Sequence, residues 1–316
     1  MTDTDKEKQW GIIYCPRGGV RRAQKRWRKI ERALKDNGVR YDFIQCENAA
    51  SVTRLVGMLI DNGYKTIIIA GGDSALNDAV NRLMAAEKEV RDSIAVGVIP
   101  NGMMNDYAHY WGISADDVEQ TIATLKQHRT RRVDVGCIEY TPSGESIMRK
   151  QYFINCVNVG LAATIMNLRR QTRRVLLGSR SLSLLASFAL MAFQRLDYKM
   201  NVKINATDIK RSNVMTMCIG NARGYGQTPS AVPYNGWLDV SMVLNPKLTQ
   251  LIAGFYMLLR GRVLNHRSVR AFRTRRVDVA EAQHAMVSVD GRMLQPHDGP
   301  FAVTVMQEEI NFLIPS

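Results

Sequence analysis

The chain has 316 residues, 46% of them hydrophobic, which is enough to fill the cores of two domains and predicts a folded globular protein. Its 43 lysines and arginines outnumber 29 aspartates and glutamates, and the net charge of +14 favours anionic membrane surfaces, nucleic acid or phosphorylated substrates as partners. The polar start, MTDTDKEKQW, lacks the apolar core of a signal peptide, and the most apolar stretch, residues 182–193, is about half the ~20 residues of a membrane span, so we expect neither export nor a transmembrane helix.

The N-terminal part alternates short apolar runs with helical patterns. Strands are predicted at residues 11–15, 41–46, 66–70 and 94–100, with helices at about 21–37, 50–62 and 75–88. This βαβαβαβ order predicts a mostly parallel sheet that binds ligands at the carboxyl ends of its strands. The loops after the third and fourth strands, GGD at 71–73 and PNGMMND at 100–106, are therefore expected to meet in one crevice.

The pattern changes after about Arg132. Apolar residues then alternate with polar ones, as at Met200, Val202 and Ile204, and a period of two is typical of antiparallel strands with one solvated side. Such strands are predicted at 199–205, 237–244, 274–280 and 285–291, and helices near 164–177, 181–196 and 247–260. The predicted fold class is α/β plus all-β, with an α/β domain at 1–132 and a β-rich domain at 133–316.

The cysteines and histidines show no metal-site pattern. No CxxC pair is present, and no histidine stands at metal-ligand spacing from a cysteine, which predicts reduced thiols in a cytoplasmic protein. The cysteines are Cys15, Cys46, Cys137, Cys156 and Cys218. The five histidines are expected to be structural or on the surface.

Five segments, in order along nearly the whole chain, resemble the signature blocks of the diacylglycerol kinase catalytic family. GGDSALNDAVNRL is similar to GGDGTLNEVVNGL, and VIPNGMMNDYAHYWGI is similar to PLGTGNDFARxLGI. YFINCVNVGLAA, PYNGWLDVSMV and VSVDGRML resemble FxNxxGxGFDA, xDDGxLDVxxV and xxVDGExx. This family includes bacterial lipid kinases and sphingosine and ceramide kinases, and it is more distantly similar to NAD kinases.

The resemblance implies a fold and an activity. The expected fold is an NAD-kinase-like, Rossmann-like α/β domain followed by a sandwich-like, β-rich lipid domain. The expected reaction transfers the γ-phosphoryl group of ATP, with Mg²⁺, to a hydroxyl of a diacylglycerol- or sphingoid-type lipid in the cleft between the domains. Such a reaction needs donors that hold phosphate, a carboxylate that takes the hydroxyl proton, and exclusion of water.

The resemblance also implies a nucleotide site, in which several positions carry altered residues. The positions are Pro16, Gly18, Gly19, Gly71, Gly72, Asp73, Ser74, Ala75, Asn77, Gly102, Met103, Asn105 and Asp106. Ser74 stands where the family has a glycine that admits phosphate close to the backbone, and Ala75 stands where it has a threonine hydroxyl. Met103 replaces a second threonine, and its thioether cannot donate a hydrogen bond to phosphate.

The implied catalytic and metal positions are altered as well. Arg292 stands where the family has its proposed proton acceptor, a glutamate, and a guanidinium cannot act as a base. Asp290 is the nearest remaining carboxylate at that turn, and Asp73 is the other candidate base. Asn235 replaces an aspartate associated with Mg²⁺, and a neutral amide is a weaker ligand for that cation.

Two functions therefore remain open. The chain is either an active lipid kinase in which Asp73 or Asp290 takes the role of base, or a catalytically impaired relative that binds lipid, nucleotide or a protein. Basic runs at 21–29, 169–174 and 260–276 are either solvated faces or a peripheral membrane surface, where each Lys or Arg contributes ~1 kcal/mol. Nucleic-acid binding is not expected, because no stacking motif accompanies these runs. A homodimer through a sheet edge stays open.

Overall fold

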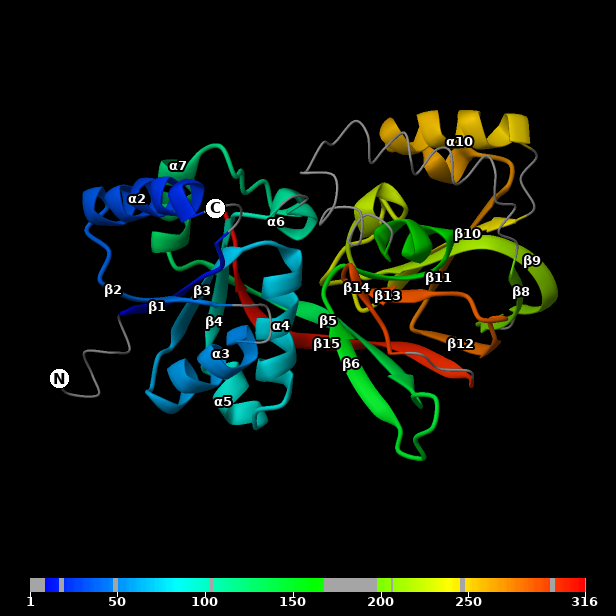
Figure 1. Cartoon of the computed structure of the whole chain (residues 1–316), viewed down its shortest axis with the longest axis horizontal. Helices are drawn as coiled ribbons and strands as arrows, with labels where there is room; N and C mark the ends of the chain where they lie inside the picture. Colours follow the sequence, from blue (N-terminus) through cyan, green and yellow to red (C-terminus); the bar gives the residue numbers. More distant parts are fainter. Residues whose placement is uncertain are drawn as a thin grey trace. The chain divides into compact units, whose positions relative to one another are not determined.

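The computed structural model describes residues 9–16, 20–47, 51–102, 105–167, 198–205, 207–244, 248–295 and 299–315. The chain divides into two compact units: unit 1 comprises residues 1–135 and 307–316, and unit 2 comprises residues 136–306. Two strands, β5 (Thr130–Tyr140) and β15 (Phe301–Leu313), belong to both units, because each crosses a boundary between them (Figure 1). The predicted boundary after Arg132 falls within β5.

Unit 1 contains a parallel sheet. Its strands lie in the order β2 (Tyr41–Gln45), β1 (Trp10–Tyr14), β3 (Thr66–Gly71), β4 (Ala95–Pro100) and the end of β15. Every residue of β1, β3 and β4 is buried, as expected for parallel strands that are covered on both faces. The predicted strands and their parallel order are confirmed.

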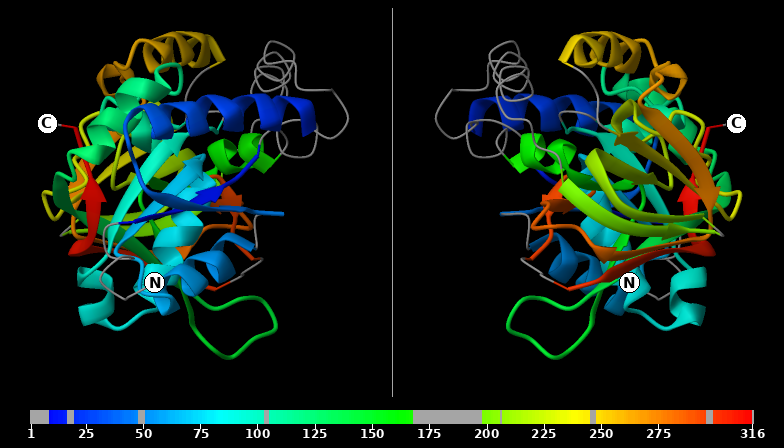
Figure 2. Two further views of the ribbon diagram at one scale, coloured as in Figure 1. Left: turned by 90° about the vertical axis from the view of Figure 1, so that its left-hand side faces the viewer. Right: turned by 90° about the vertical axis from the view of Figure 1, so that its right-hand side faces the viewer.

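Helices cover both faces of this sheet (Figures 1 and 2). One face carries α2 (Val20–Asp36) and α7 (Val118–Lys126), and the other carries α3 (Ser51–Asp61) and α4 (Asp73–Met84). Two short helices, α5 (Lys88–Asp92) and α6 (Asp106–Tyr110), complete the unit. The helix predicted at 75–88 begins two residues earlier and ends at Met84, and α5 follows as a separate helix.

The last residues of the chain complete the sheet of unit 1. Asn311 pairs with Ala95 in parallel register, so the end of β15 covers the outer edge of β4. Arg91 forms an ion pair with Glu309, with only 9% and 16% of the two side chains exposed. Removing one partner of a buried pair leaves an uncompensated charge, so this contact fixes the end of β15.

Unit 2 is built mainly of antiparallel strands. They lie in the order β14-β13-β7-β9-β8-β12-β15, with β10 between β9 and β11, and β6 paired with β5. The bounds are β6 Arg149–Phe153, β7 Cys156–Gly160, β8 Tyr198–Ile204, β9 Thr207–Gly220, β10 Leu238–Leu244, β11 Val269–Thr274, β12 Arg276–Glu281, β13 Val287–Val289 and β14 Arg292–Met293. Among the described residues of this unit, helical segments include η1 Gly224–Gly226, α10 Leu248–Leu259 and η2 Val263–Asn265, and residues 161–167 are helical as well.

The core of unit 2 follows the alternation in the sequence. Met200, Val202 and Ile204 are buried, while Lys203 between them is exposed. The predicted α/β plus all-β class is confirmed, and α10 corresponds to the helix predicted at 247–260. The helix predicted at 181–196, most of that at 164–177 and the basic run at 169–174 lie outside the described residues. Among the helices that the structure describes, none combines the length and the apolar character that a membrane crossing requires.

Candidate functional site

The loops that follow β3 and β4 meet at the carboxyl edge of the sheet in unit 1. A Cβ atom on Gly102 would lie 2.4 Å from the Cα atom of Gly72, and one on Gly72 would lie 2.8 Å from the Cα atom of Gly102. Both contacts join backbone to backbone, so no side chain can move aside to make room. The expected meeting of the two loops is confirmed, and it requires glycine at both positions.

Asp73 holds this junction together. It is the first residue of α4, and its carboxylate accepts hydrogen bonds from the backbone N–H groups of Asp106 (2.8 Å) and Tyr107 (3.2 Å) at the start of α6. The residue is 8% exposed. Burial raises the pKa of Asp73 to about 6, and the nearby charge of Asp106 acts in the same direction against the two hydrogen bonds. Asp73 thus binds one loop to the other.

Two asparagines shape the second loop. The side-chain oxygen of Asn105, a residue with φ of 49°, accepts a 2.7 Å hydrogen bond from the Gly102 N–H, and its amide donates to the Gly102 carbonyl at 3.2 Å. Asn101 donates its backbone N–H to the Gly71 carbonyl at 2.8 Å and its side-chain amide to the Cys15 carbonyl at 3.0 Å. These bonds connect the ends of β1, β3 and β4.

The arrangement leaves the N-terminus of α4 at the sheet edge. Gly72 precedes the helix in an extended conformation, and Ser74, in the first turn, is exposed. The unpaired N–H groups and the dipole of such a terminus favour an anion such as phosphate. Ala75 and Asn77 are buried, and the Asn77 side-chain oxygen accepts a hydrogen bond from Asn81, so these two predicted residues support the helix from within.

The structure describes only part of the predicted nucleotide site. It brings together the residues at 71–77, Gly102, Asn105 and Asp106. Pro16 is half-buried just after β1. Gly18, Gly19 and Met103 lie outside the described residues, so their predicted roles stay predictions.

Asp290 has a comparable position in unit 2. It lies in the turn between β13 and β14 with φ of 46° and is 2% exposed. Its carboxylate accepts hydrogen bonds from three consecutive backbone N–H groups, those of Ile154 (2.8 Å), Asn155 (3.0 Å) and Cys156 (2.8 Å). Asp290 therefore fixes the connection between β6 and β7. Arg292 begins β14, pairs with Val289 and is half-buried.

The predicted metal position is part of a turn. The side-chain oxygen of Asn235 accepts a 3.0 Å hydrogen bond from the backbone N–H of Trp237, two residues later. In the part of the chain that the structure describes, no group of three or more His, Cys, Asp or Glu side chains is placed to hold a metal ion. Asn235 thus serves the local turn, and its predicted role toward Mg²⁺ stays a prediction.

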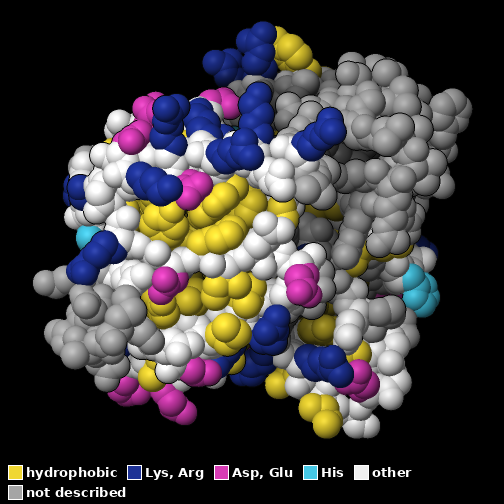
Figure 3. Space-filling model, turned by 60° about the vertical axis from the view of Figure 1, so that its left-hand side comes forward, with side chains coloured by type: hydrophobic (Ala, Val, Ile, Leu, Met, Phe, Trp, Pro, Cys, Tyr) yellow, Lys and Arg dark blue, Asp and Glu magenta, His cyan; other side chains and the backbone are white. Residues whose placement is uncertain are grey.

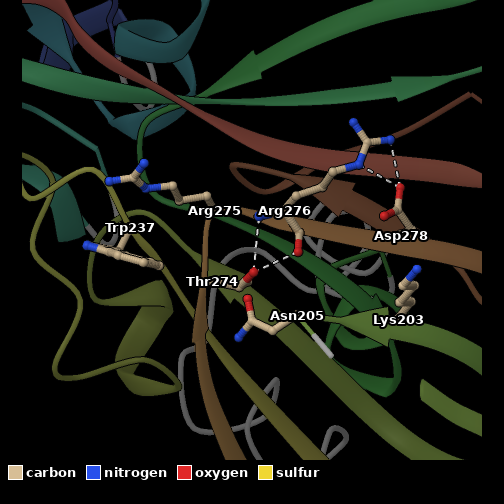
Figure 4. A pocket seen from close by; sticks show the side chains of 7 residues that line it. All are labelled: Lys203, Asn205, Trp237, Thr274, Arg275, Arg276 and Asp278. Atoms are coloured by element: carbon tan, nitrogen blue, oxygen red, sulfur yellow. Dashed lines mark hydrogen bonds and ion pairs between the residues drawn. The ribbon is translucent and has the colours of Figure 1, made fainter. Parts of the chain in front are cut away.

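A cavity of about 340 Å³ lies at the strand ends of unit 2 (Figure 4). The Arg275 guanidinium lies 4.7 Å from the centre of the Trp237 ring, and Arg276 pairs with Asp278 at 2.7 Å. The remaining lining residues are Lys203, Asn205 and Thr274. Sequence reasoning missed this cavity because its residues come from four separate strand ends, and the excess of cations makes it suitable for a small anion.

Family comparisons match both parts of the chain. The diacylglycerol kinase catalytic domain matches residues 9–138, and the YegS C-terminal NAD kinase beta sandwich-like domain matches residues 155–313. The chain belongs to the diacylglycerol kinase family of lipid kinases. The predicted resemblance is thereby confirmed, and the two matched regions carry the two loops of unit 1 and the Asp290 turn of unit 2.

Individual relatives are distant. The chain is 21% identical to the diacylglycerol kinase of Bacillus subtilis over 285 residues, which is 90% of this chain and 89% of that relative. It is 26% identical to the Bacillus subtilis protein YtlR over 159 residues, a match that spans about half (49%) of each chain. The crystal structure of a diacylglycerol kinase from Bacillus anthracis strain Sterne aligns with a TM-score of 0.66 and 14% identity over 98% of this chain and 97% of that one. This last likeness shows the fold.

Proposed function

We propose that this family member is an ATP-dependent lipid kinase-like protein whose acceptor is a hydroxyl of a diacylglycerol- or sphingoid-type lipid. The observation that supports the proposal is the intact loop junction of unit 1. Gly72, Asp73, Gly102 and Asp106 are all residues of the family signature, and they form a single hydrogen-bonded and close-packed unit at the N-terminus of α4. Such a unit suits the binding of the phosphate groups of a nucleotide.

The chain's own groups would hold and orient the nucleotide. The N–H groups of Asp73 and Ser74 at the start of α4 and the exposed Ser74 hydroxyl can donate to phosphate oxygens, whereas the Ala75 N–H already donates to the Gly72 carbonyl at 2.9 Å. Arg26 keeps the end of β4 in place, because it donates to the Pro100 carbonyl at 3.0 Å and to the Ala115 carbonyl at 2.7 Å. Mg²⁺ supplies charge neutralisation and usually binds through substrate phosphates, so it would enter with ATP without a protein cage.

A second function is favoured by the state of the two candidate bases. The oxygens of Asp73 accept two backbone hydrogen bonds and those of Asp290 accept three, so both carboxylates already serve the local fold. Arg292 cannot accept a proton. Phosphoryl transfer depends mainly on positioning and charge stabilisation, so the lack of a base slows turnover more than it affects binding. The alternative is thus a family member that binds nucleotide or lipid with little or no transfer.

A basic and apolar surface supports contact with an anionic membrane. Helix α2 carries eight lysines and arginines and two acidic residues. Beside it, the rings of Trp27 and Phe43 stack with centroids 3.7 Å apart, and Phe43, on the edge strand β2, is 37% exposed. Figure 3 shows apolar side chains with lysines and arginines around them on this side of unit 1. Aromatic rings and cations together suit a lipid headgroup layer.

The decisive experiment combines transfer with binding. Purified full-length protein is incubated with labelled ATP, Mg²⁺ and anionic vesicles that contain diacylglycerol or a sphingoid base. If the protein is an active kinase, we expect labelled lipid phosphate. If it only binds nucleotide, we expect ATP to raise the thermal midpoint of the protein while the lipid stays unlabelled. If no acceptor gives labelled lipid and ATP does not raise the thermal midpoint, both functions are ruled out. Gly102→Ala, in the loop junction, should lose the ATP response, and Gly254→Ala, in α10 of unit 2, should keep it.

A restored variant tests the altered motif positions directly. The double substitution Met103→Thr and Arg292→Glu returns a hydroxyl to the second loop and a carboxylate to the catalytic position. We expect tighter ATP binding or faster transfer than in the parent chain, measured side by side in the same vesicles. Identical behaviour of the two proteins would contradict the assignment of these two positions.

A further inference from the structure

Two cysteines lie next to each other at the carboxyl edge of the sheet in unit 1. Strands β1 and β2 are parallel, and their last register pair is Tyr14 with Gln45, so Cys15 and Cys46 are the next pair. The Cys46 N–H continues the ladder by donating to the Tyr14 carbonyl at 2.9 Å. Neighbouring strands are about 4.8 Å apart, which falls within the range of Cα separations, about 4.4–6.8 Å, that a disulfide spans.

The thiols of this pair interact. The Cys15 side chain forms a hydrogen bond with that of Cys46, and this bond lowers the pKa of the Cys46 thiol although burial and the charge of Asp78 oppose the effect. Cys15 is half-buried, so a small molecule can reach the pair from the sheet edge. Cys137 differs, because burial raises its pKa to about 11. Two neighbouring thiols, one of them only half-buried, are an arrangement in which cysteines oxidise to a disulfide.

The pair is also connected to the loop junction. The Cys15 carbonyl accepts the hydrogen bond from the Asn101 side chain at 3.0 Å. The Cys15 N–H donates to the Ala70 carbonyl at 2.9 Å, and the Cys15 Cβ atom is 3.4 Å from the place that a Cβ atom on Gly71 would occupy. A covalent change at Cys15 would therefore act on the ends of β3 and β4.

We propose that Cys15 and Cys46 are an oxidative modification site, at which a hydroperoxide converts the two thiols into a reversible disulfide beside the loop junction. One thiolate attacks the peroxide; its sulfur–oxygen bond forms as the oxygen–oxygen bond breaks, and an alcohol or water leaves. The second sulfur attacks the resulting sulfenic acid, the sulfur–sulfur bond forms, and the oxygen leaves as water. Two electrons pass from sulfur to the peroxide, and the two thiol protons end on the two oxygens.

The chemistry of the pair and its effect on ligand binding are separate claims. The disulfide depends only on the adjacency of Cys15 and Cys46. Its effect on nucleotide binding rests on the proposed function. A disulfide from Cys15 to Cys46 at the end of β2 displaces the Cys15 carbonyl, and this displacement loosens Asn101 and the second loop. ATP affinity should then fall several-fold in the oxidised protein and recover on reduction.

Peptide mapping of the full-length protein tests the disulfide. The reduced protein is treated with hydrogen peroxide, free thiols are alkylated, and the chain is digested with trypsin, which places Cys15 in the peptide 9–17 and Cys46 in the peptide 41–54. The expected product is these two peptides joined, with a mass two hydrogens below their sum, and dithiothreitol should separate them. Cys46→Ser should abolish the joined peptide, whereas Cys218→Ser, at a fully buried thiol of unit 2, should leave it unchanged.

Two outcomes would overturn the proposal. One is recovery of peptides 9–17 and 41–54 as separate species after peroxide treatment; the other is a link from either cysteine to Cys137, Cys156 or Cys218. ATP titration of the reduced and oxidised protein gives an independent readout. Equal affinity in both forms would refute the coupling to the loops, and a reduced protein that does not bind ATP would refute the proposed nucleotide site while the joined peptide still supports the thiol pair.

Discussion

Asp73 and Asp290 perform the same kind of task in the two units with different partners. The Asp73 carboxylate accepts hydrogen bonds from two N–H groups at the start of a short helix and so joins two loops beside a sheet edge. Asp290 receives three N–H groups from an irregular connection between strands and lies in a left-handed turn. The difference shows that a carboxylate in a kinase signature can be retained for the backbone that it organises, so a motif match does not by itself identify a catalytic base.

The largest effect is expected when Asp290 is removed. Asp290→Ala would leave three buried N–H groups without an acceptor, and we expect a loss of about 4 kcal/mol in the free energy of unfolding. Urea denaturation of the purified variant measures it. A loss below about 1 kcal/mol would mean that water or a neighbouring group replaces the carboxylate, and it would remove the basis for comparing Asp290 with Asp73.

The close contact between Gly72 and Gly102 tests whether the loop junction that Asp73 holds in unit 1 is tightly packed. Gly102→Ala places a Cβ atom 2.4 Å from the Gly72 Cα atom, and overpacking against backbone should lower the free energy of unfolding by about 2–3 kcal/mol. Gly254→Ala is the control: its Cβ atom would have no neighbour closer than 3.9 Å, and alanine in a helix interior should be neutral or stabilising by roughly 0.5–1 kcal/mol. Equal effects at the two positions would contradict a close-packed loop junction.

The protonation of Asp73 gives a smaller, pH-dependent effect. Its pKa is about 6 in the folded protein and 3.8 as the reference value, so the folded state binds the proton more tightly. Stability from this group is therefore fully present below pH 4 and is lost as the pH rises through 6. Relative to Asp73→Asn, the wild-type free energy of unfolding should fall by about 2–3 kcal/mol between pH 4 and 7. A constant difference across this range would contradict the raised pKa.

An exposed carboxylate in unit 2 provides the smallest effect and calibrates the others. Asp278 pairs with Arg276 at 2.7 Å, but 44% and 55% of the two side chains are exposed. Asp278→Asn should change the free energy of unfolding by less than about 1 kcal/mol, and less still at high salt, because solvent already screens the pair. A loss of stability as large as that of Asp290→Ala would mean that burial does not explain the difference in stabilising effect between Asp278 and Asp290.

The sequence predicted those elements whose positions follow from the periodic spacing of apolar residues. Runs such as Ile67–Ile69 and the alternation at Met200, Val202 and Ile204 identified the strands, and the parallel order of the first four placed two distant loops at one edge. The family blocks added the identity of the loops. These signals are local or ordered along the chain, so a single sequence carries them.

Other features depend on pairings that no local pattern contains. The partners of Asp73 and Asp290 are backbone N–H groups of segments more than thirty residues away, and any residue type could supply them. The adjacency of Cys15 and Cys46 requires the register of β1 and β2, and the cavity beside Trp237 requires four strand ends at once. The sequence-based division at residue 132 placed the C-terminal strand with the second domain, whereas its last residues pack in unit 1.

The contribution of β15 to unit 1 bears on how the protein is made. A ribosome releases β1, β2, β3 and β4 long before Asn311 and Phe312, so the edge of β4 stays open until this distant segment has been made. An open edge of buried, apolar strand is a template for pairing with another chain. Nascent chains that have not yet reached Phe312 should therefore depend on chaperones at this edge, because the pairing of Asn311 and Phe312 with β4 closes it.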